Sequence, residues 1–112
     1  MTQQPALFAA PTRVPHPGSA CCDLTQDLAG WIRQQRARIA RDWRWSRAWR
    51  ARGDRLDRAS IRAYASGDDT TGRAHQLDSI TAHGRANAHA QTALTRAGHV
   101  DRVEAAHQWR LT

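Results

Sequence analysis

When the residues between positions 24 and 49 are placed at 100° intervals, as in an α-helix, the large hydrophobic side chains fall on one face. Three polar residues, Gln35, Asp42 and Ser46, fall within this face and make it imperfect. Arginines are spread over the opposite side of the predicted helix. The pattern predicts one long amphipathic helix. Its hydrophobic face carries Leu24, Leu28, Trp31, Ile32, Ile39, Trp43 and Trp49.

The ends of this helix are indicated by capping residues. Asp23 can accept hydrogen bonds at the N-terminus, and Gln26 stands three positions later, as in a capping box. Gly53 supplies a C-terminal stop. We therefore expect the helix over residues 23–52.

From Asp23 onward the chain has no proline and is dominated by Ala, Arg, Gln and Leu, so further helices are predicted after residue 53. The predicted elements are a helix over residues 54–65, a turn over 66–69, a helix from Asp69 or Thr70 to residue 97 and a last helix over 100–110. The helix that ends at residue 97 has a seam of small and aliphatic residues suited to close packing. The seam consists of Leu77, Ile80, Gly84, Ala88, Gln91 and Leu94. The expected fold is an all-α bundle of three or four helices.

The first 22 residues differ from the rest. They hold all the prolines and show no hydrophobic periodicity, so we interpret residues 1–22 as a disordered arm and residues 23–112 as a single helical domain. The adjacent thiols of Cys21 and Cys22 cannot link distant parts of the fold, which favours a cytoplasmic location. The prolines stand at positions 5, 11, 15 and 17.

Composition limits the hydrophobic core. The chain has 112 residues and is 40% hydrophobic, but 21 of its residues are alanine and only 15 are Leu, Ile, Val or Phe. A chain this small holds one domain, and its core is thin enough that a partner could complete it. Because the small-residue seam leaves apolar surface to cover, a homodimer is expected.

Positive charge is concentrated in one segment. The chain carries a formal net charge of +7, and residues 33–62 hold 11 arginines against three aspartates. A basic stripe on a helix is typical of a protein that binds a polyanion, because each neutralised phosphate releases condensed counterions. The simpler interpretation is a solvated helix face in a chain that uses arginine in place of lysine.

Tryptophans lie among these arginines. Trp43 and Trp49 are on the hydrophobic face and are predicted to be core residues, whereas Trp45 projects away from it and could stack on a base. Trp45 could equally be covered by the arm or by another helix. The residues predicted to contact nucleic acid are Arg36, Arg41, Arg44, Trp45, Arg47, Arg50, Arg52, Arg55 and Arg58.

Other sites find little support. The third helix could be the reading helix of a helix-turn-helix, with Thr70, Thr71, Arg73 and Gln76 facing the groove, but its start is poor in base-reading side chains. No metal-binding spacing is present, so the histidines are predicted to be surface residues. No catalytic motif, cofactor loop or membrane-spanning stretch occurs either, so the sequence predicts no enzyme, no metal, no cofactor and no membrane insertion.

The sequence thus favours a small, basic, non-enzymatic protein that binds nucleic acid, DNA or RNA, through an arginine- and tryptophan-rich helix. A regulatory or accessory role on a mobile element is a hypothesis from size and charge. The alternative is an adaptor or inhibitor that folds fully on an acidic protein partner, which would explain the thin core equally well.

Overall fold

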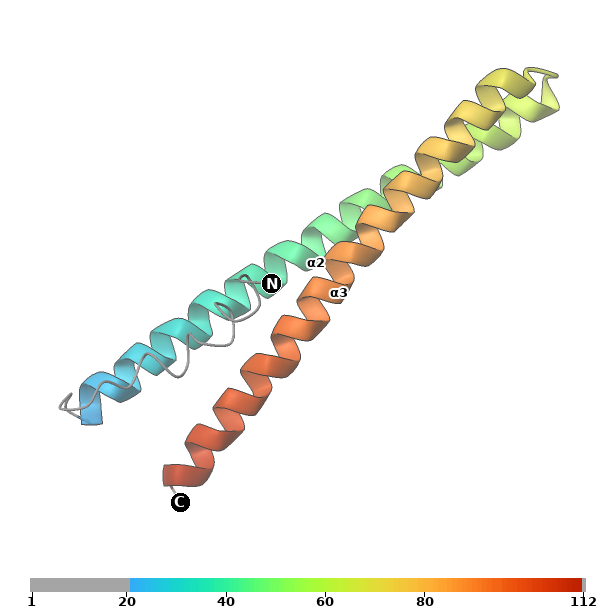
Figure 1. The fold of residues 1–112 in the computed structure, drawn as a ribbon. Helices are drawn as coiled ribbons and strands as arrows, with labels where there is room; N and C mark the ends of the chain where they lie inside the picture. The colour runs from blue at the N-terminus through green and yellow to red at the C-terminus, as the bar shows by residue number, and fades with distance from the viewer. Residues whose placement is uncertain (1–20, 112) are drawn as a thin grey trace, which may run out of the picture. The chain divides into compact units, whose positions relative to one another are not determined.

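The structure, a computed structural model, describes the backbone of residues 21–111 and the side chains of residues 27–108. Helix α2 (Cys21–Ala65) and helix α3 (Asp69–Leu111) are joined by one short turn (Figure 1). No strand occurs among the described residues, so the all-α prediction is confirmed. Neither helix is long and apolar enough to cross a membrane. The predicted arm lies outside the described residues, apart from Cys21 and Cys22, which begin α2.

The prediction of three or four helices is wrong, because two expected breaks are absent. Gly53 lies inside α2 and Gly98 lies inside α3, so residues 23–52 and 54–65 form one helix, as do residues 70–97 and 100–110. Glycine weakens an isolated helix by about 1 kcal/mol relative to alanine, which packing against a neighbouring helix can outweigh.

The turn between the helices follows the sequence prediction. Gly67 adopts a φ of 87°, where glycine is favoured, and its N–H donates to Tyr64 O while the next N–H, that of Asp68, donates to Ala63 O. Asp68 then caps α3 by accepting a hydrogen bond from the Thr71 N–H at 3.1 Å. Hydrogen bonds from the side chain and backbone of Thr71 hold the pKa of Asp68 below its ordinary value of 3.8.

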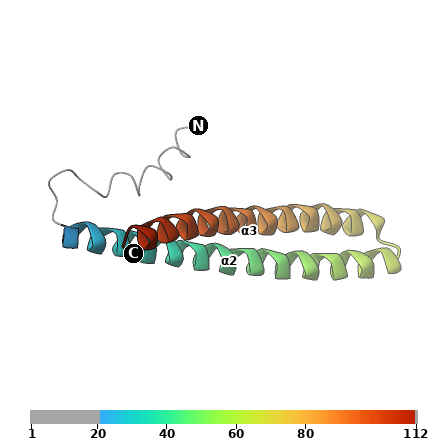
Figure 2. The same cartoon turned by 90° about the horizontal axis from the view of Figure 1, so that it is seen from below.

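The chain divides into two compact units, each of which contains part of both helices. One comprises Ala40–Ala93 and is called the turn unit; the other, whose described part is residues 21–39 with residues 94–111, is called the end unit. In the turn unit the green part of α2 and the yellow part of α3 run side by side in opposite directions (Figure 2).

Small residues spaced by seven hold the turn unit together. On α2 they are Ser46, Gly53 and Ser60, and on α3 they are Gly72, Ser79 and Ala86, all of them buried. Serine hydroxyls donate across the helix pair to backbone carbonyls. The pairs are Ser46 to Ala86 O at 2.8 Å, Ser60 to Gly72 O at 2.8 Å and Ser79 to Gly53 O at 3.3 Å. A seven-residue step on α2 thus matches a seven-residue step back along α3, which fixes an antiparallel register.

This register excludes the helix-turn-helix considered above. The two helices of that motif cross at a large angle, at about 90–120°. The hydrogen bonds between the two helices repeat over two further steps of seven residues. The helix axes are therefore nearly antiparallel and do not cross at a large angle. The residues predicted to face a DNA groove, among them Thr71 and Gln76, therefore do not belong to such a motif, and Gln76 instead accepts a hydrogen bond from the Tyr64 hydroxyl at 3.2 Å.

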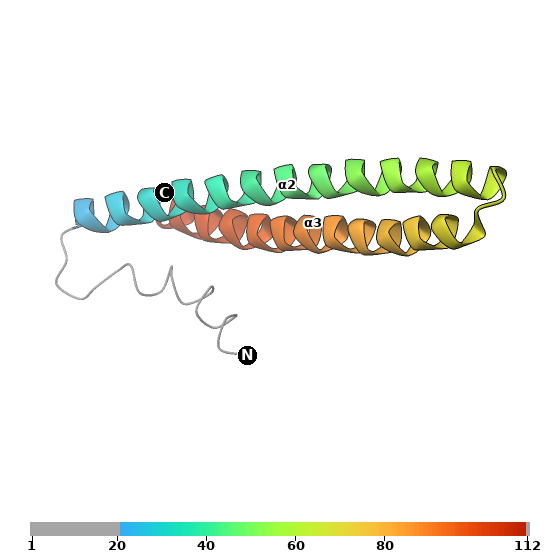
Figure 3. The ribbon, with the colours of Figure 1, turned by 90° about the horizontal axis from the view of Figure 1, so that it is seen from above.

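The end unit has a conventional hydrophobic cluster. Leu28 and Trp31 of α2 pack with Val100 of α3, and Ile32, Ile39 and Val103 lie against them. Figure 3 shows the corresponding cyan part of α2 beside the red part of α3. These α2 residues belong to the hydrophobic face that the sequence predicts, and that prediction is confirmed for them.

The predicted seam of α3 is wrong. Leu77, Ile80 and Leu94 are 52%, 62% and 55% exposed, and Gly84, Ala88 and Gln91 are exposed as well. The buried side of α3 is instead the series of small residues spaced by seven. Because the serine–carbonyl hydrogen bonds require a close approach of the two backbones, bulky leucines do not fit there.

Candidate nucleic-acid interface

In the turn unit, helix α2 carries many arginines. Every arginine in this part of α2 is exposed, and within the described residues none of these guanidinium groups forms an ion pair with a carboxylate. We call this set the arginine surface. It consists of Arg41, Arg44, Arg47, Arg50, Arg52, Arg55, Arg58 and Arg62.

The three carboxylates in the same part of α2 contact histidines of α3. Asp42 Oδ1 lies 3.0 Å from His89 Nδ1. Asp54 Oδ1 and Asp57 Oδ2 lie 3.7 Å and 3.1 Å from His83 Nε2. These carboxylates contact histidines of α3 and form no ion pair with the arginine surface. The positive charge of that surface therefore has no direct carboxylate partner in the described part of the chain.

Arg36 differs from the other predicted site residues. It lies in the end unit, where its Nη2 donates to Glu104 Oε1 at 2.6 Å and lies 4.0 Å from Asp101 Oδ1. Two carboxylates of α3 therefore compensate the charge of Arg36. The structure does not bring Arg36 into the same unit as the arginine surface.

Trp45 is half exposed and lies on the ring of a histidine. Its exposed fraction is 51%, and its ring stacks on His89 with the centroids 6.1 Å apart and the planes at 20°. Since His89 also contacts Asp42, the indole is supported from one side by a side chain that is itself held in place. The other two tryptophans of this unit, Trp43 and Trp49, are half buried. The guanidinium of Arg85 lies 4.7 Å from the ring centroid of Trp49.

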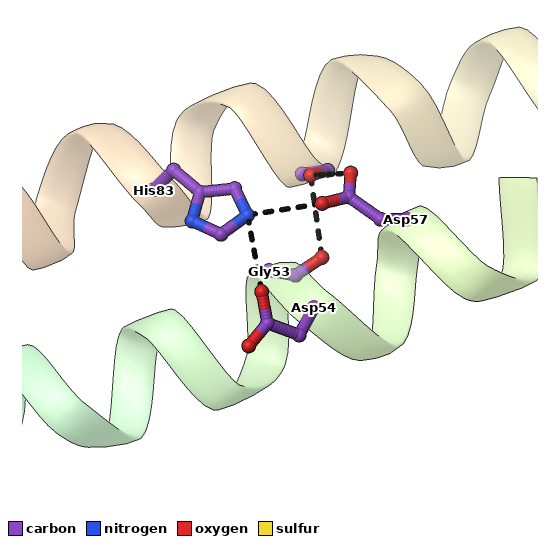
Figure 4. Close-up of polar contacts among 5 residues, drawn as sticks. Gly53, Asp54, Asp57 and His83 are labelled. Carbon is purple, nitrogen blue, oxygen red and sulfur yellow. Dashed lines mark hydrogen bonds and ion pairs between the residues drawn. The ribbon is translucent and has the colours of Figure 1, made fainter.

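Asp57 is at the centre of a polar contact that joins the helices (Figure 4). The Ser79 hydroxyl donates to Asp57 Oδ1, and His83 Nε2 lies beside Oδ2. Hydrogen bonds from Ser79 and then His83 hold the pKa of Asp57 below its ordinary value of 3.8. Asp57 is therefore ionised throughout the neutral range.

Sequence reasoning missed that Asp54, Asp57 and His83 come together. Their proximity depends on the register of α2 against α3. Predicting each helix separately does not show which residues of the two helices face each other. The signal that could have found it is the seven-residue spacing of small residues in both helices, because it aligns Gly53 with Ser79 and so brings His83 beside Asp57.

Comparison with known proteins gives no relative. No protein-family model matches the chain, and neither a curated protein nor a solved structure is similar enough to count as a match.

Proposed function

We propose that this protein binds nucleic acid through the arginine surface of α2, with Trp45 as a stacking residue. The observation that supports the proposal best is that eight exposed arginines of one helix have no carboxylate partner among the described residues, while the nearby carboxylates contact histidines of α3. A regulatory or accessory role, on a mobile element, is the task we propose for a small binder of this kind.

The physical basis of binding is electrostatic. Each arginine that replaces a counterion at a phosphate contributes to affinity, and this contribution declines as salt concentration rises. The planar guanidinium group also forks onto phosphate oxygens in a way that a lysine ammonium cannot. The half-exposed indole of Trp45 adds a flat apolar surface on which an unpaired base can stack.

The test is an anisotropy titration with labelled single- and double-stranded oligonucleotides at several salt concentrations. In the variant R44Q/R58Q we expect weaker binding and a salt slope smaller by about two, roughly one for each lost phosphate contact. The matched control is R73Q/R102Q, which removes the same charge from exposed positions of α3. Equal losses in the two variants would mean that only net charge matters, and an unchanged slope in R44Q/R58Q would contradict the proposal.

Trp45 is tested in the same titration. W45A should weaken binding of the single-stranded oligonucleotide by about 1–3 kcal/mol if the ring stacks on a base, with a smaller effect on the duplex. The thermal melt of W45A supplies the control for folding, because a half-exposed ring contributes little to the core.

The second candidate is an adaptor or inhibitor that binds an acidic protein. The exposed Leu77 and Ile80 of α3 favour it, because exposed aliphatic side chains are common at protein interfaces. Competition separates the two functions: heparin or random DNA displaces a polyanion from the arginine surface, whereas a shaped protein interface resists both. Self-association as a homodimer, through the same side of α3, stays a prediction.

A further inference from the structure

Three metal-ligating side chains that are not part of the arginine surface converge in the turn unit. Asp54 and Asp57 are three residues apart on α2 and so lie on one side of the helix, and His83 faces them from α3 (Figure 4). One ligand atom from each lies within 4.8 Å of the other two. The side chains of Asp54, Asp57 and His83 are 55%, 50% and 34% exposed, so an ion can reach them from solvent.

The backbone of α2 makes room for the imidazole. A Cβ at Gly53 would stand 2.6 Å from His83 Nε2 and 2.8 Å from the adjacent ring carbons, so a side chain at position 53 and the ring in its present position exclude each other. Nε2 consequently points between the two carboxylates. This explains why α2 tolerates a glycine at its interior, where helix propensity disfavours it.

The second helix also orients one carboxylate. The Ser79 hydroxyl shares its single proton between Asp57 Oδ1 and Gly53 O, and Asp57 Oδ2 is turned toward His83. Hydrogen bonds of this kind, made to the oxygen that does not bind the ion, fix the orientation of metal-ligating carboxylates.

From this arrangement we propose that Asp54, Asp57 and His83 bind a divalent transition-metal ion of the Zn²⁺ type. Zinc bonds to histidine nitrogen and carboxylate oxygen are about 2.0–2.2 Å long, which puts the ligands of a tetrahedral ion about 3.4 Å apart. His83 Nε2 lies 3.7 Å and 3.1 Å from the two carboxylate oxygens, so small side-chain adjustments bring all three atoms to one ion.

The donor set selects the class of ion. One imidazole with two carboxylates suits zinc and its neighbours, whereas calcium and magnesium prefer oxygen ligands alone. Histidine binds a metal ion as the neutral imidazole, here through Nε2. Three protein ligands leave a fourth position for water or for an external ligand.

A bound ion would cross-link α2 and α3 within the turn unit, so thermal stability provides a readout that does not depend on nucleic acid. The experiment uses the full chain with C21S and C22S, because adjacent thiolates are themselves zinc ligands, after treatment with a chelator. Zn²⁺ at a hundred times its Kd should raise the Tm by on the order of 10 °C. Co²⁺ in place of zinc should give the visible absorption bands of a tetrahedral site.

Two variants locate the ion. D54N and H83Q should each weaken Zn²⁺ binding by about tenfold or more and remove the Co²⁺ bands. D54N is the decisive one, since Asp54 is half exposed and pairs with His83, so its replacement should disturb the fold little. The matched control D78N changes an exposed aspartate of α3 and should bind as the parent does. The proposal is overturned if zinc leaves the Tm of the parent unchanged, or if D54N responds to zinc as strongly as D78N.

Discussion

The turn unit and the end unit pair segments of the same two helices by different means. In the end unit the contact is made by Leu28, Trp31 and Val100, which bury large side chains. In the turn unit it is made by serine, glycine and alanine, and serine hydroxyls donate to the carbonyls of the facing helix. A chain poor in large aliphatic residues can thus pair its helices by bringing the backbones close together and satisfying polar groups across the contact.

Polar side chains are also accommodated differently in the two units. Asp42, which is half-buried in the turn unit, contacts His89, and among the described side chains no buried nitrogen or oxygen of that unit lacks a partner. In the end unit Gln35 accepts a hydrogen bond from Arg96 at 2.7 Å, but Trp31 Nε1 is buried without a partner among the described residues. The end unit is therefore the one that depends on apolar burial.

The largest expected effect is the loss of that burial. W31A should lower the free energy of unfolding by about 3–5 kcal/mol, because Trp31 is 8% exposed and fills the cluster around Val100. Chemical denaturation followed by circular dichroism measures the change. W45A is the control, since the ring of Trp45 is half exposed in the parent protein. A similar loss in both variants would contradict the account of the end unit.

The turn unit should respond to added bulk instead. A86L inserts a large side chain at a position that is 0% exposed and faces Ser46, so we expect a loss of about 1–3 kcal/mol. A88L makes the same substitution two residues further on, at an exposed position, and should change stability by less than about 0.5 kcal/mol. If A86L is as stable as A88L in thermal melts, close approach of the backbones is not what holds the turn unit.

Acid should affect the two units in separate pH ranges. Burial, with a smaller effect of Arg102, lowers the pKa of His99 in the end unit below 6.5, so folding favours the neutral ring and stability is lost as pH falls below 6.5. The lowered pKa values of Asp57 and Asp68 in the turn unit stabilise the folded state above 3.8, and that stability is lost only as pH falls below 3.8. Hydrogen exchange at pH 7, 5 and 3.5 should therefore show the end unit opening first. Simultaneous loss of protection would contradict this order.

The sequence predicted local features well. The turn at residues 66–69, the start of α3 and the hydrophobic residues that α2 contributes to the end unit follow from capping chemistry and from a periodicity that large side chains make visible. The exposure of Arg41, Arg44 and their neighbours also follows from the amphipathic pattern, whereas their role in binding stays a prediction.

The features that were missed depend on contacts between the helices. Gly53 resembles a helix stop in isolation, but it provides the space into which His83 fits. The sequence pattern favours Leu77 and Ile80 as packing residues because large aliphatic side chains are usually buried, whereas the residues at the buried positions of this part of α3 are small. Polar Asp42 and Ser46 interrupt the hydrophobic face of α2 in the sequence, yet both have hydrogen-bond partners on α3.

The seven-residue spacing that aligns Ser46, Gly53 and Ser60 with their partners restricts how the length of this protein can change in evolution. An insertion of one residue between Gly53 and Ser60 would rotate every later position of α2 by about 100° and carry Ser60 away from Gly72. Excision of residues 54–60 together with 72–78 removes one whole repeat from each helix and leaves the other pairs facing each other. Viable length variants of the turn unit should therefore differ by matched blocks of seven residues.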